Sequence, residues 1–410
     1  MKGNKLTFFI LLAMVLGVIA GYIVHVQSSE DTIKSFADNI KLLSTIFIRL
    51  VQMIIAPLVF TTLVVGIAKL GDLKTVGRVG GKAILWFVTA SLASLLIGMV
   101  LVNYFEPGQY INTSIQDTEG LKDLAGKQRS FSLQNFVEHI IPKSFIEAMA
   151  TNEILQLVVF SIFFGVAAAS IGEYARPLIR ALEVASHIIL KMVNYVMNFA
   201  PLGVFGAIAA VVAAKGLGIF EFYIRYFSYF LIGIACLWTL LLSVGFIILR
   251  GRMKELMRRI SSPLLIAFST TSSEAVFPKL TEELERFGCR DKIVAFVLPL
   301  GYSFNLDGSM MYMTFASMAI AQAFGIHLDI STQLTMLLVL MLTSKGIAGV
   351  PRASLVVVLA TCAMFDIPAV GVALILPIDH FCDMFRTATN VVGNALATSV
   401  VSKWEGELGE

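Results

Sequence analysis

The sequence predicts an all-α protein that crosses a membrane many times, and three observations lead to this fold class. Of the 410 residues, 57% are hydrophobic and 14% are charged, whereas a soluble protein carries about 25% charged residues. Uncharged stretches recur along the chain at the length of about 20 residues that a helix needs to cross a bilayer. In the first half, charged residues gather between these stretches. Together these features argue against a water-soluble enzyme.

Six candidate helices precede the basic segment that begins at Arg250. Their uncharged stretches lie between Lys5 and Glu30, Lys41 and Lys69 (interrupted by Arg49), Lys82 and Glu106, Glu153 and Glu173, Lys191 and Lys215, and Arg225 and Arg250. The basic loops 69–82 and 250–259 are expected in the cytoplasm, because Lys and Arg favour that side. The acidic segment 106–153 is then external, and we interpret the first helix as retained rather than as a cleaved signal.

Polar groups interrupt each apolar stretch after Arg250. A re-entrant hairpin is expected at about 257–287, because a straight crossing would place the polar tip from Ser269 to Glu274 at the bilayer midplane. A second hairpin is expected at about 332–366, where glycines and Pro351 break the helix between two apolar arms. The free amides and hydroxyls of such tips can serve a ligand.

Two further helices complete the predicted pattern. The helix at about 292–324 is interrupted at Asn305–Gly308, where Asn, Asp and Gly favour an unwound turn whose carbonyls can bind a cation. The last helix is expected at about 369–403. The order of hairpin, broken helix, hairpin and polar helix is typical of inverted repeats that form a transport site. In total, the sequence predicts eight transmembrane helices plus two re-entrant hairpins, with both termini in the cytoplasm.

The last helix carries a stripe of polar residues on one face. Its members are Asp379, Asp383, Arg386, Thr387, Asn390 and Asn394, most of them three or four positions apart as neighbours on a helix face are. An ionisable group at bilayer depth costs about 2.5–3.5 kcal/mol. We therefore favour a functional site in the second half of the chain. The alternatives are a structural network on this helix, a satisfied kink at the Asn-Asp-Gly turn, and water-exposed loops between short helices.

These side chains suggest the chemistry of a ligand. The Arg386 guanidinium can bind a carboxylate in a bidentate manner, and a neighbouring Asp can hold an ammonium group. Ser and Asn side chains, together with hairpin amides, can hold a second carboxylate. A zwitterionic dicarboxylate such as aspartate or glutamate fits this set. Its uptake against a gradient needs a cation, for which Glu274 or the carbonyls near Asn305 are candidates.

Five segments of the sequence carry a family resemblance. They are TTSSEAVFP from Thr270, NLDG from Asn305, KGIAGVP from Lys345, DMFRTATNVVGN from Asp383 and LVQMIIAPLVF from Leu50. With these motifs the chain resembles, over almost its whole length, the dicarboxylate/amino acid:cation symporters. These are prokaryotic relatives of the excitatory amino acid transporters.

The resemblance implies an architecture and a mechanism. It implies a homotrimer in the prokaryotic plasma or inner membrane, in which a transport domain moves by an elevator mechanism against a scaffold. Residues 1–80 would hold scaffold helices 1 and 2, residues 81–106 transport-domain helix 3, and residues 107–216 an extracellular segment with scaffold helices 4 and 5. Residues 217–410 would complete the transport domain with helix 6, both hairpins and helices 7 and 8.

The resemblance also implies roles for individual residues. Arg386 would bind the substrate side-chain carboxylate and Asp383 its amino group. The main carboxylate would be held by Ser272, Ser273, Ser309, Thr387 and Asn390, and the second tip, with Ala348, Gly349, Val350 and Ser354, would be the gate. Positions that serve cations in sodium-coupled members are Gly301, Ser303, Asn305, Asp307, Ser344, Asn390 and Asn394, with sodium itself at Gly301, Asn305, Asp307 and Asn390. No cofactor and no catalytic residue is expected.

Three residues depart from the usual family pattern. Asn394 replaces the Asp ligand usual in sodium-coupled members, which removes a negative charge from one sodium site. Glu274 replaces the more common Ser, and a carboxyl group inside the membrane can carry a proton. Arg352 stands where Gly is frequent. The first two resemble proton-coupled glutamate carriers, so we favour protons as the coupling ion and keep sodium as the alternative.

Other functions fit the sequence less well. Carriers of C4-dicarboxylates such as succinate are the nearest alternative, but those members lack an Asp at the position of Asp383. A membrane enzyme would need a nucleophile–base pair or a metal motif such as HExxH, and neither occurs. A passive channel fits poorly with a compact site between two hairpin tips. The four cysteines and five histidines are scattered, which predicts neither a disulfide framework nor a metal site, and a net charge of +3 predicts no nucleic-acid partner.

Overall fold

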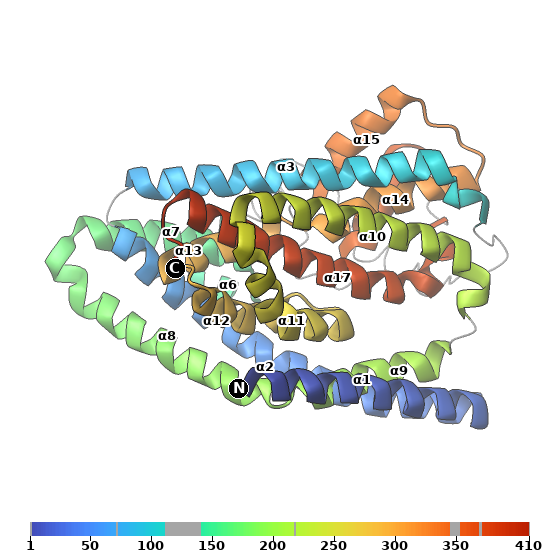
Figure 1. The fold of residues 1–410 in the computed structure, drawn as a ribbon, viewed down its shortest axis with the longest axis horizontal. Coiled ribbons are helices and arrows are strands. Elements are labelled where there is room, and N and C mark those ends of the chain that lie inside the picture. Colours follow the sequence, from blue (N-terminus) through green and yellow to red (C-terminus); the bar gives the residue numbers. More distant parts are fainter. Residues whose placement is uncertain are drawn as a thin grey trace.

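The computed structural model describes residues 2–70, 73–110, 141–216, 219–344, 353–368 and 371–409, and these ranges are helical apart from short connections (Figure 1). The α-helices are α1 (Lys2–Gln27), α2 (Glu30–Leu70), α3 (Leu73–Phe105), α6 (Phe145–Ala150), α7 (Ile154–Ser170), α8 (Arg176–Met197), α9 (Ala200–Lys215), α10 (Ile219–Leu249), α11 (Met253–Thr270), α12 (Phe277–Phe287), α13 (Asp291–Phe304), α14 (Asp307–Ala323), α15 (Ile330–Thr343), α16 (Ala353–Met364) and α17 (Gly371–Trp404). Short 3₁₀ turns are η1 (Pro107–Tyr110), η2 (Gly172–Ala175), η3 (Arg250–Arg252) and η4 (Glu274–Val276).

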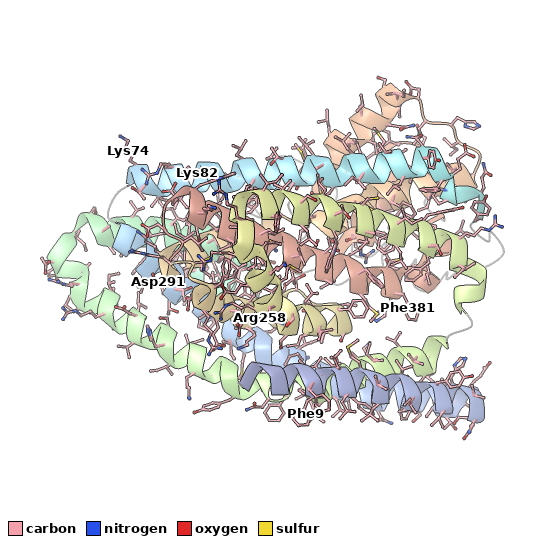
Figure 2. All side chains as sticks on the ribbon, in the orientation of Figure 1. Phe9, Lys74, Lys82, Arg258, Asp291 and Phe381 are labelled. Carbon is pink, nitrogen blue, oxygen red and sulfur yellow. The ribbon has the colours of Figure 1, made fainter. Side chains whose placement is uncertain are left out.

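Several helices are long and apolar enough to cross a bilayer. By length and composition, the described part of the chain contains four such stretches, namely Phe8–Gln27, Glu30–Ala68, Lys74–Phe105 and Tyr223–Thr270. Their outer faces expose large apolar side chains such as Phe9 on α1, which points away from the bundle in Figure 2. An apolar outer face is stable in lipid and costly in water, so the structure is that of a multi-pass membrane protein. The count of eight crossings stays a prediction.

The helices form two packed groups. In the first, α2 and α9 are the centre, and α1, α7 and α8 pack against them. Close approach depends on small residues, because a Cβ atom at Gly21 of α1 would lie 2.7 Å from the Ala209 carbonyl oxygen of α9. In the second group, α17 runs through the middle and contacts α10, α11, α13 and α14 (Figure 1).

The second group has the more deeply buried interior. Every residue of α14 from Asp307 to Ala321 is buried, which is expected of a helix that is enclosed on all sides. From Thr387 onward α17 is almost as enclosed, and Asn390, Asn394 and Ser399 lie within it. Polar side chains on α17 can therefore meet those of α14 in a volume that solvent barely reaches.

The interrupted elements expected from the sequence are present in the described residues. The helix α11 ends at Thr270, and the next residue, Thr271, has left-handed dihedral angles (φ of 52° and ψ of 31°), a rare conformation for a β-branched residue. The chain then turns through η4 into α12. The helices α13 and α14 are separated at Asn305 and Leu306, where both residues have non-helical dihedral angles. The arms α15 and α16 match the second hairpin, while its tip, 345–352, lies outside the described residues.

One expected loop is largely helical. The basic segment 69–82 was predicted to join two helices, but α3 already begins at Leu73. Its basic residues Lys74, Arg78 and Lys82 lie on the first turns of α3, because Lys and Arg are good helix formers and long side chains reach outward from such positions. The third helix therefore starts well before the predicted boundary of the uncharged stretch at Lys82.

A short C-terminal segment closes one end of the second group. Glu405 pairs with Arg78 at 2.9 Å and with Lys82 at 2.6 Å, and Glu407 pairs with Arg290 at 2.9 Å and with Lys292 at 2.6 Å. Burial acts to raise the pKa of Glu405, but the hydrogen bonds and charges of Arg78 and Lys82 outweigh it and hold this pKa below its usual value. We call residues 404–409 the C-terminal clasp, because they join the basic ends of α3 and α13.

Candidate functional site

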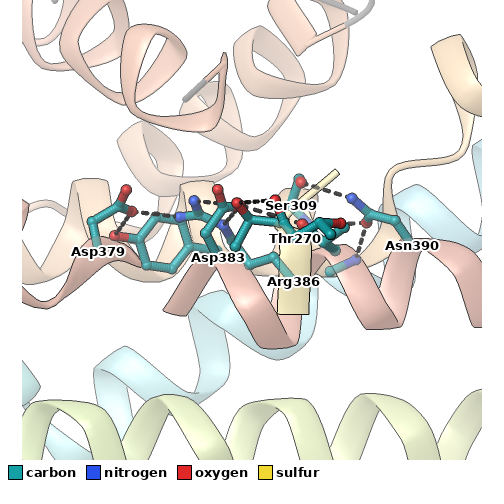
Figure 3. Close-up of polar contacts among 10 residues, drawn as sticks. Thr270, Ser309, Asp379, Asp383, Arg386 and Asn390 are labelled. Atoms are coloured by element: carbon teal, nitrogen blue, oxygen red, sulfur yellow. Dashed lines mark hydrogen bonds and ion pairs between the residues drawn. The ribbon is translucent and has the colours of Figure 1, made fainter. Parts of the chain in front are cut away.

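Arg386 of α17 lies at the centre of a buried cluster of charged groups (Figure 3). Its Nη1 atom is 2.7 Å from Oδ1 of Asp379, and its Nη2 atom is 2.8 Å from Oδ1 of Asp383. The two acids differ in exposure, since the Asp379 side chain is 1% exposed and that of Asp383 is 21% exposed. Asp379 is therefore an enclosed counterion, whereas Asp383 reaches the edge of the cluster.

Tyr312 of α14 completes this arrangement. Its hydroxyl donates a hydrogen bond of 3.0 Å to Oδ1 of Asp379, and its ring centroid lies 4.0 Å from the guanidinium carbon of Arg386. An aromatic face stabilises a cation at this distance. The guanidinium plane is thus fixed by Asp379 and Tyr312, so its remaining donors face the side on which Asp383 lies.

Asn390 joins α17 to the start of α14. Its Oδ1 accepts from the backbone amides of Gly308 at 2.9 Å and Ser309 at 3.2 Å, and its Nδ2 donates to the Ser309 hydroxyl at 3.0 Å. The Thr387 hydroxyl lies 3.5 Å from Oδ1 of Asp383. The start of a helix favours anions, and the Asn390 amide and the Thr387 and Ser309 hydroxyls gather there, so a carboxylate beside the Arg386 cluster could exchange with these hydrogen bonds.

The serines of the first hairpin tip are partly exposed. The Ser272 hydroxyl accepts a hydrogen bond of 3.2 Å from the Ala275 amide, which fixes the turn. Ser273 precedes η4 without capping it. Because both residues are partly exposed, a ligand can approach this tip.

A second polar cluster surrounds the break between α13 and α14. The Nδ2 atom of Asn305 donates to Oδ2 of Asp307 at 3.2 Å and to Oδ1 of Asn394 at 3.3 Å. These three side chains, which we call the Asn305 cluster, belong to residues that are at most 1% exposed. A Cβ atom at Gly301 would lie 2.4 Å from Oδ1 of Asn394, so glycine at this position allows Asn394 to approach.

The Asn305 cluster is rich in oxygen atoms. Oδ1 of Asn305 and the nearby Ser303 hydroxyl are buried and have no hydrogen-bond partner within the described ranges. Carboxylate, amide and hydroxyl oxygens are the ligands that hard cations prefer. Buried oxygens without a partner are costly, and a cation bound here would remove that cost. Of the predicted sodium residues, Asn305 and Asp307 thus lie together in this oxygen-rich cluster, whereas Asn390 bonds to Gly308 and Ser309, and the sodium site stays a prediction.

The remaining predicted residues lie elsewhere. Glu274 stands on η4, where its carboxyl accepts a hydrogen bond from the side chain of Gln52 on α2. Ser344 directly follows α15 and is buried, with its hydroxyl donating to the Met341 carbonyl oxygen at 3.1 Å. Ser354 is buried at the start of α16. Ala348, Gly349, Val350 and Arg352 lie outside the described residues.

Two contributors to the Arg386 cluster were not predicted as site residues. Asp379 was noticed as part of the polar stripe but received no role, although its position seven residues before Arg386 places both on one face two turns apart. Tyr312 comes from another helix, and no spacing rule within the sequence links it to Arg386. Only the packing of α14 on α17 brings the two together.

This arrangement of helices, with interrupted segments around a buried polar centre, defines a membrane transporter of the secondary active class. A sequence profile of the sodium:dicarboxylate symporter family matches residues 6–404. The chain therefore belongs to this family, and it is a symporter rather than an enzyme.

The curated relatives carry two kinds of name. A proton/sodium-glutamate symport protein of Bacillus caldotenax is 37% identical over 420 aligned positions, covering 100% of this chain and 97% of the relative. A protein with the same name from Geobacillus stearothermophilus is 38% identical, with the same coverage. A C4-dicarboxylate transport protein of Laribacter hongkongensis (strain HLHK9) is 40% identical, covering 99% of this chain and 90% of the relative. Overall identity thus leaves the substrate open between these two classes.

Proposed function

We propose that this protein imports acidic amino acids, L-glutamate or L-aspartate, by secondary active symport. The observation that carries this proposal is the ion pair between Arg386 and the partly exposed Asp383. An amino acid with an acidic side chain can replace both partners of that pair. Its side-chain carboxylate takes the guanidinium, its ammonium group takes Asp383, and its main carboxylate lies at Asn390, Ser309 and Thr387, facing the serines of the first tip.

The charges of the cluster favour an amino acid over a dicarboxylate. Asp379 and Asp383 carry two negative charges against the one positive charge of Arg386 when all three are ionised. A C4-dicarboxylate brings two more negative charges and no group that can satisfy Asp383. The partly buried Asp383 carboxylate would then lose its partner, and a charge that is left unpaired away from water is unfavourable. The amino group of glutamate or aspartate removes this problem.

A C4-dicarboxylate carrier remains the second candidate function. It is supported by the names of several relatives at 39–40% identity and by the Arg386 guanidinium, which suits any carboxylate. For that function Asp383 would have to bind a proton in place of an ammonium group. Competition between unlabelled succinate and labelled glutamate separates the two candidates directly.

We further propose that protons, with sodium as the alternative, drive this uptake. The Asn305 cluster holds one carboxylate, Asp307, because Asn394 contributes an amide. A site with fewer negative ligands binds a cation more weakly. Glu274 supplies a carboxyl at the hairpin tip that can carry a proton. This combination supports the proton as the main coupling ion.

We propose the trimer, the domain division and the elevator movement on the basis of family membership and helix packing. The first helix group would be the scaffold and the trimer-forming part, and the second group would be the transport domain that moves as an elevator. This division is supported by the packing of α3, which contacts α13, α14 and α17 of the second group although it follows α2 in the chain. A prokaryotic cell membrane location with both termini in the cytoplasm belongs to the same proposal.

The test is uptake into proteoliposomes that contain the purified full-length protein. Labelled glutamate or aspartate should accumulate when the outside is acidic, and excess unlabelled succinate should compete poorly. Sodium and proton gradients are imposed separately, so that each coupling ion is measured alone. Strong competition by succinate together with absent glutamate uptake would reject the amino acid assignment. Uptake that needs sodium and ignores pH would reject the proton assignment.

A further inference from the structure

The helix α15, the first arm of the second hairpin, lies at the periphery of the second group and stands out from it in Figure 1. It packs against α3, α14 and α16 through a face on which Leu337 and Leu340 are buried. The opposite face exposes four large apolar side chains, Ile330, Leu334, Leu338 and Leu342. The arm is thus attached to the bundle along one side only.

A pair of side-chain amides joins the beginning of α15 to α3. Nδ2 of Asn103 donates to Oε1 of Gln333 at 2.7 Å, and Nε2 of Gln333 donates to Oδ1 of Asn103 at 3.1 Å. Nε2 of Gln333 also donates to the Leu328 carbonyl oxygen at 2.8 Å, and Nδ2 of Asn103 donates to that of Met99 at 3.0 Å. Gln333 is 6% exposed, so opening of the pair would leave a buried amide without its partner, which is costly.

The end of α3 that carries Asn103 is itself fixed to the second group. Nε2 of Gln322, on α14, donates to the Val102 carbonyl oxygen at 3.0 Å. The ring of Phe105 stacks on that of Tyr229 on α10, with the ring centroids 4.7 Å apart. The turn η1, which follows α3, packs against both α10 and α14. Asn103 therefore stands on a rigid support.

The other contacts of α15 are less directional than this amide pair. The Thr335 and Thr343 hydroxyls donate to carbonyl oxygens of their own helix, both at 2.9 Å. The buried apolar side chains have no preferred direction of contact, so they can slide along α3 and α14. Leu342 lies nine positions beyond Gln333, about 13 Å along the helix. A small change in helix angle at Gln333 therefore produces a larger displacement at Leu342.

We propose that the Asn103–Gln333 pair is the pivot on which α15 changes its angle to α3 during transport. Reciprocal hydrogen bonds between two side chains can persist during such a change, because side-chain torsions follow the movement while the backbones stay intact. Asn103 and Gln333 are then positioning residues, since they act on the substrate only through the placement of the arm. This inference rests on the proposed transport function and adds the residues that place the second hairpin.

The test measures distances along α15 without substrate. The exposed Cys236 is replaced by serine, while the other three cysteines are buried. Spin labels are attached at Val100→Cys on α3 and at either Ile330→Cys or Leu342→Cys on α15, all three being exposed positions. Double electron–electron resonance on the full-length protein in liposomes gives the distribution of each distance. The distribution to Ile330, near the pivot, should be narrower than the distribution to Leu342.

Variants of the pair then test the pivot itself. Asn103→Leu and Gln333→Leu should each broaden the near distribution until it is as wide as the far one. The exchange of Asn103→Gln with Gln333→Asn keeps both amides and the summed side-chain length, and it should restore the narrow distribution. Asn39→Leu is the control, because Asn39 is an exposed amide that bonds to Ser35 of its own helix, and it should leave both distributions unchanged.

Glutamate uptake gives a second readout. The KM should rise about fivefold in each leucine variant and return in the exchange variant, because a loosely placed arm lowers the population that binds substrate. In the unmodified protein, a near distribution as wide as the far one overturns the pivot, as does an unchanged near distribution in both leucine variants. If the distances behave as expected but the unmodified protein takes up no glutamate, the proposed substrate is rejected and the pivot is retained.

Discussion

The two buried polar clusters both include side chains of α17 and of the α13–α14 region, but they differ in kind. Around Arg386 the polar atoms are charged and are paired with each other, through Asp379, Asp383 and Tyr312. Around Asn305 they are mostly amides and hydroxyls, and some oxygens have no hydrogen-bond partner among the described residues. The first cluster can accept a ligand only by exchanging partners, which suits a zwitterion. The second offers oxygen ligands without such an exchange, which suits a cation.

The largest expected effect comes from removing the centre of the first cluster. Arg386→Ala should abolish uptake of acidic amino acids, and the two acids left uncompensated should lower stability by about 3–5 kcal/mol. Uptake and the unfolding temperature of the purified protein are measured together.

Arg386→Lys keeps the charge without the bidentate fork, so a folded but inactive variant is expected. Arg176→Ala is the control, because Arg176 is exposed and pairs with the exposed Glu173. Normal glutamate uptake by Arg386→Lys would contradict the binding scheme.

The next effect tests the exchange of partners. Asp383→Ser removes the proposed partner of the ammonium group and keeps the enclosed Asp379. The KM for glutamate should rise about tenfold or more, since hydrogen bonds to charged groups contribute about 1.5–3 kcal/mol. Succinate should compete more strongly than with the unmodified protein, because its carboxylate no longer meets Asp383. Initial rates against substrate concentration measure both. If succinate competition stays the same, Asp383 does not set the substrate class.

The smallest expected effect tests the second cluster. Asn394→Asp adds a carboxylate beside Asn305 and Asp307, so sodium should bind more tightly. The sodium concentration for half-maximal uptake should fall about tenfold if one unit charge is added near the ion. The KM for glutamate at saturating sodium should change little, since Asn394 is not part of the Arg386 cluster. A sodium dependence identical to that of the unmodified protein would show that the Asn305 cluster is not a sodium site.

Much of the fold was predictable because membrane helices are long and apolar. The bounds of the first hairpin, the broken helix and the last helix agree with α11–α12, α13–α14 and α17 to within a few residues. The break was predictable from Asn305, Asp307 and Gly308, since these residue types favour turns. The start of α3 was not predictable from its basic residues, because Lys and Arg occur both in loops and at helix ends, and charge alone does not distinguish the two.

The sites were predictable only where one helix contains their members. Asp383, Arg386 and Asn390 share a face of α17, so the helical period reveals them. Tyr312 comes from another helix and joins the Arg386 cluster through packing over a long sequence distance. A single sequence gives no direct signal for such pairs. The motif-based prediction found Glu274, but its contact with Gln52 became apparent only from the position of η4 against α2.

The C-terminal clasp bears on how the chain is made. Arg78 and Lys82 are synthesised long before their partner Glu405, which lies near the other end of the sequence. Throughout the insertion of the intervening helices these cations therefore have no acid from the clasp beside them, and they can act with full strength in orienting the early helices. The clasp then neutralises them in the finished protein. Orientation during synthesis and ion pairing afterwards thus use the same side chains at different times.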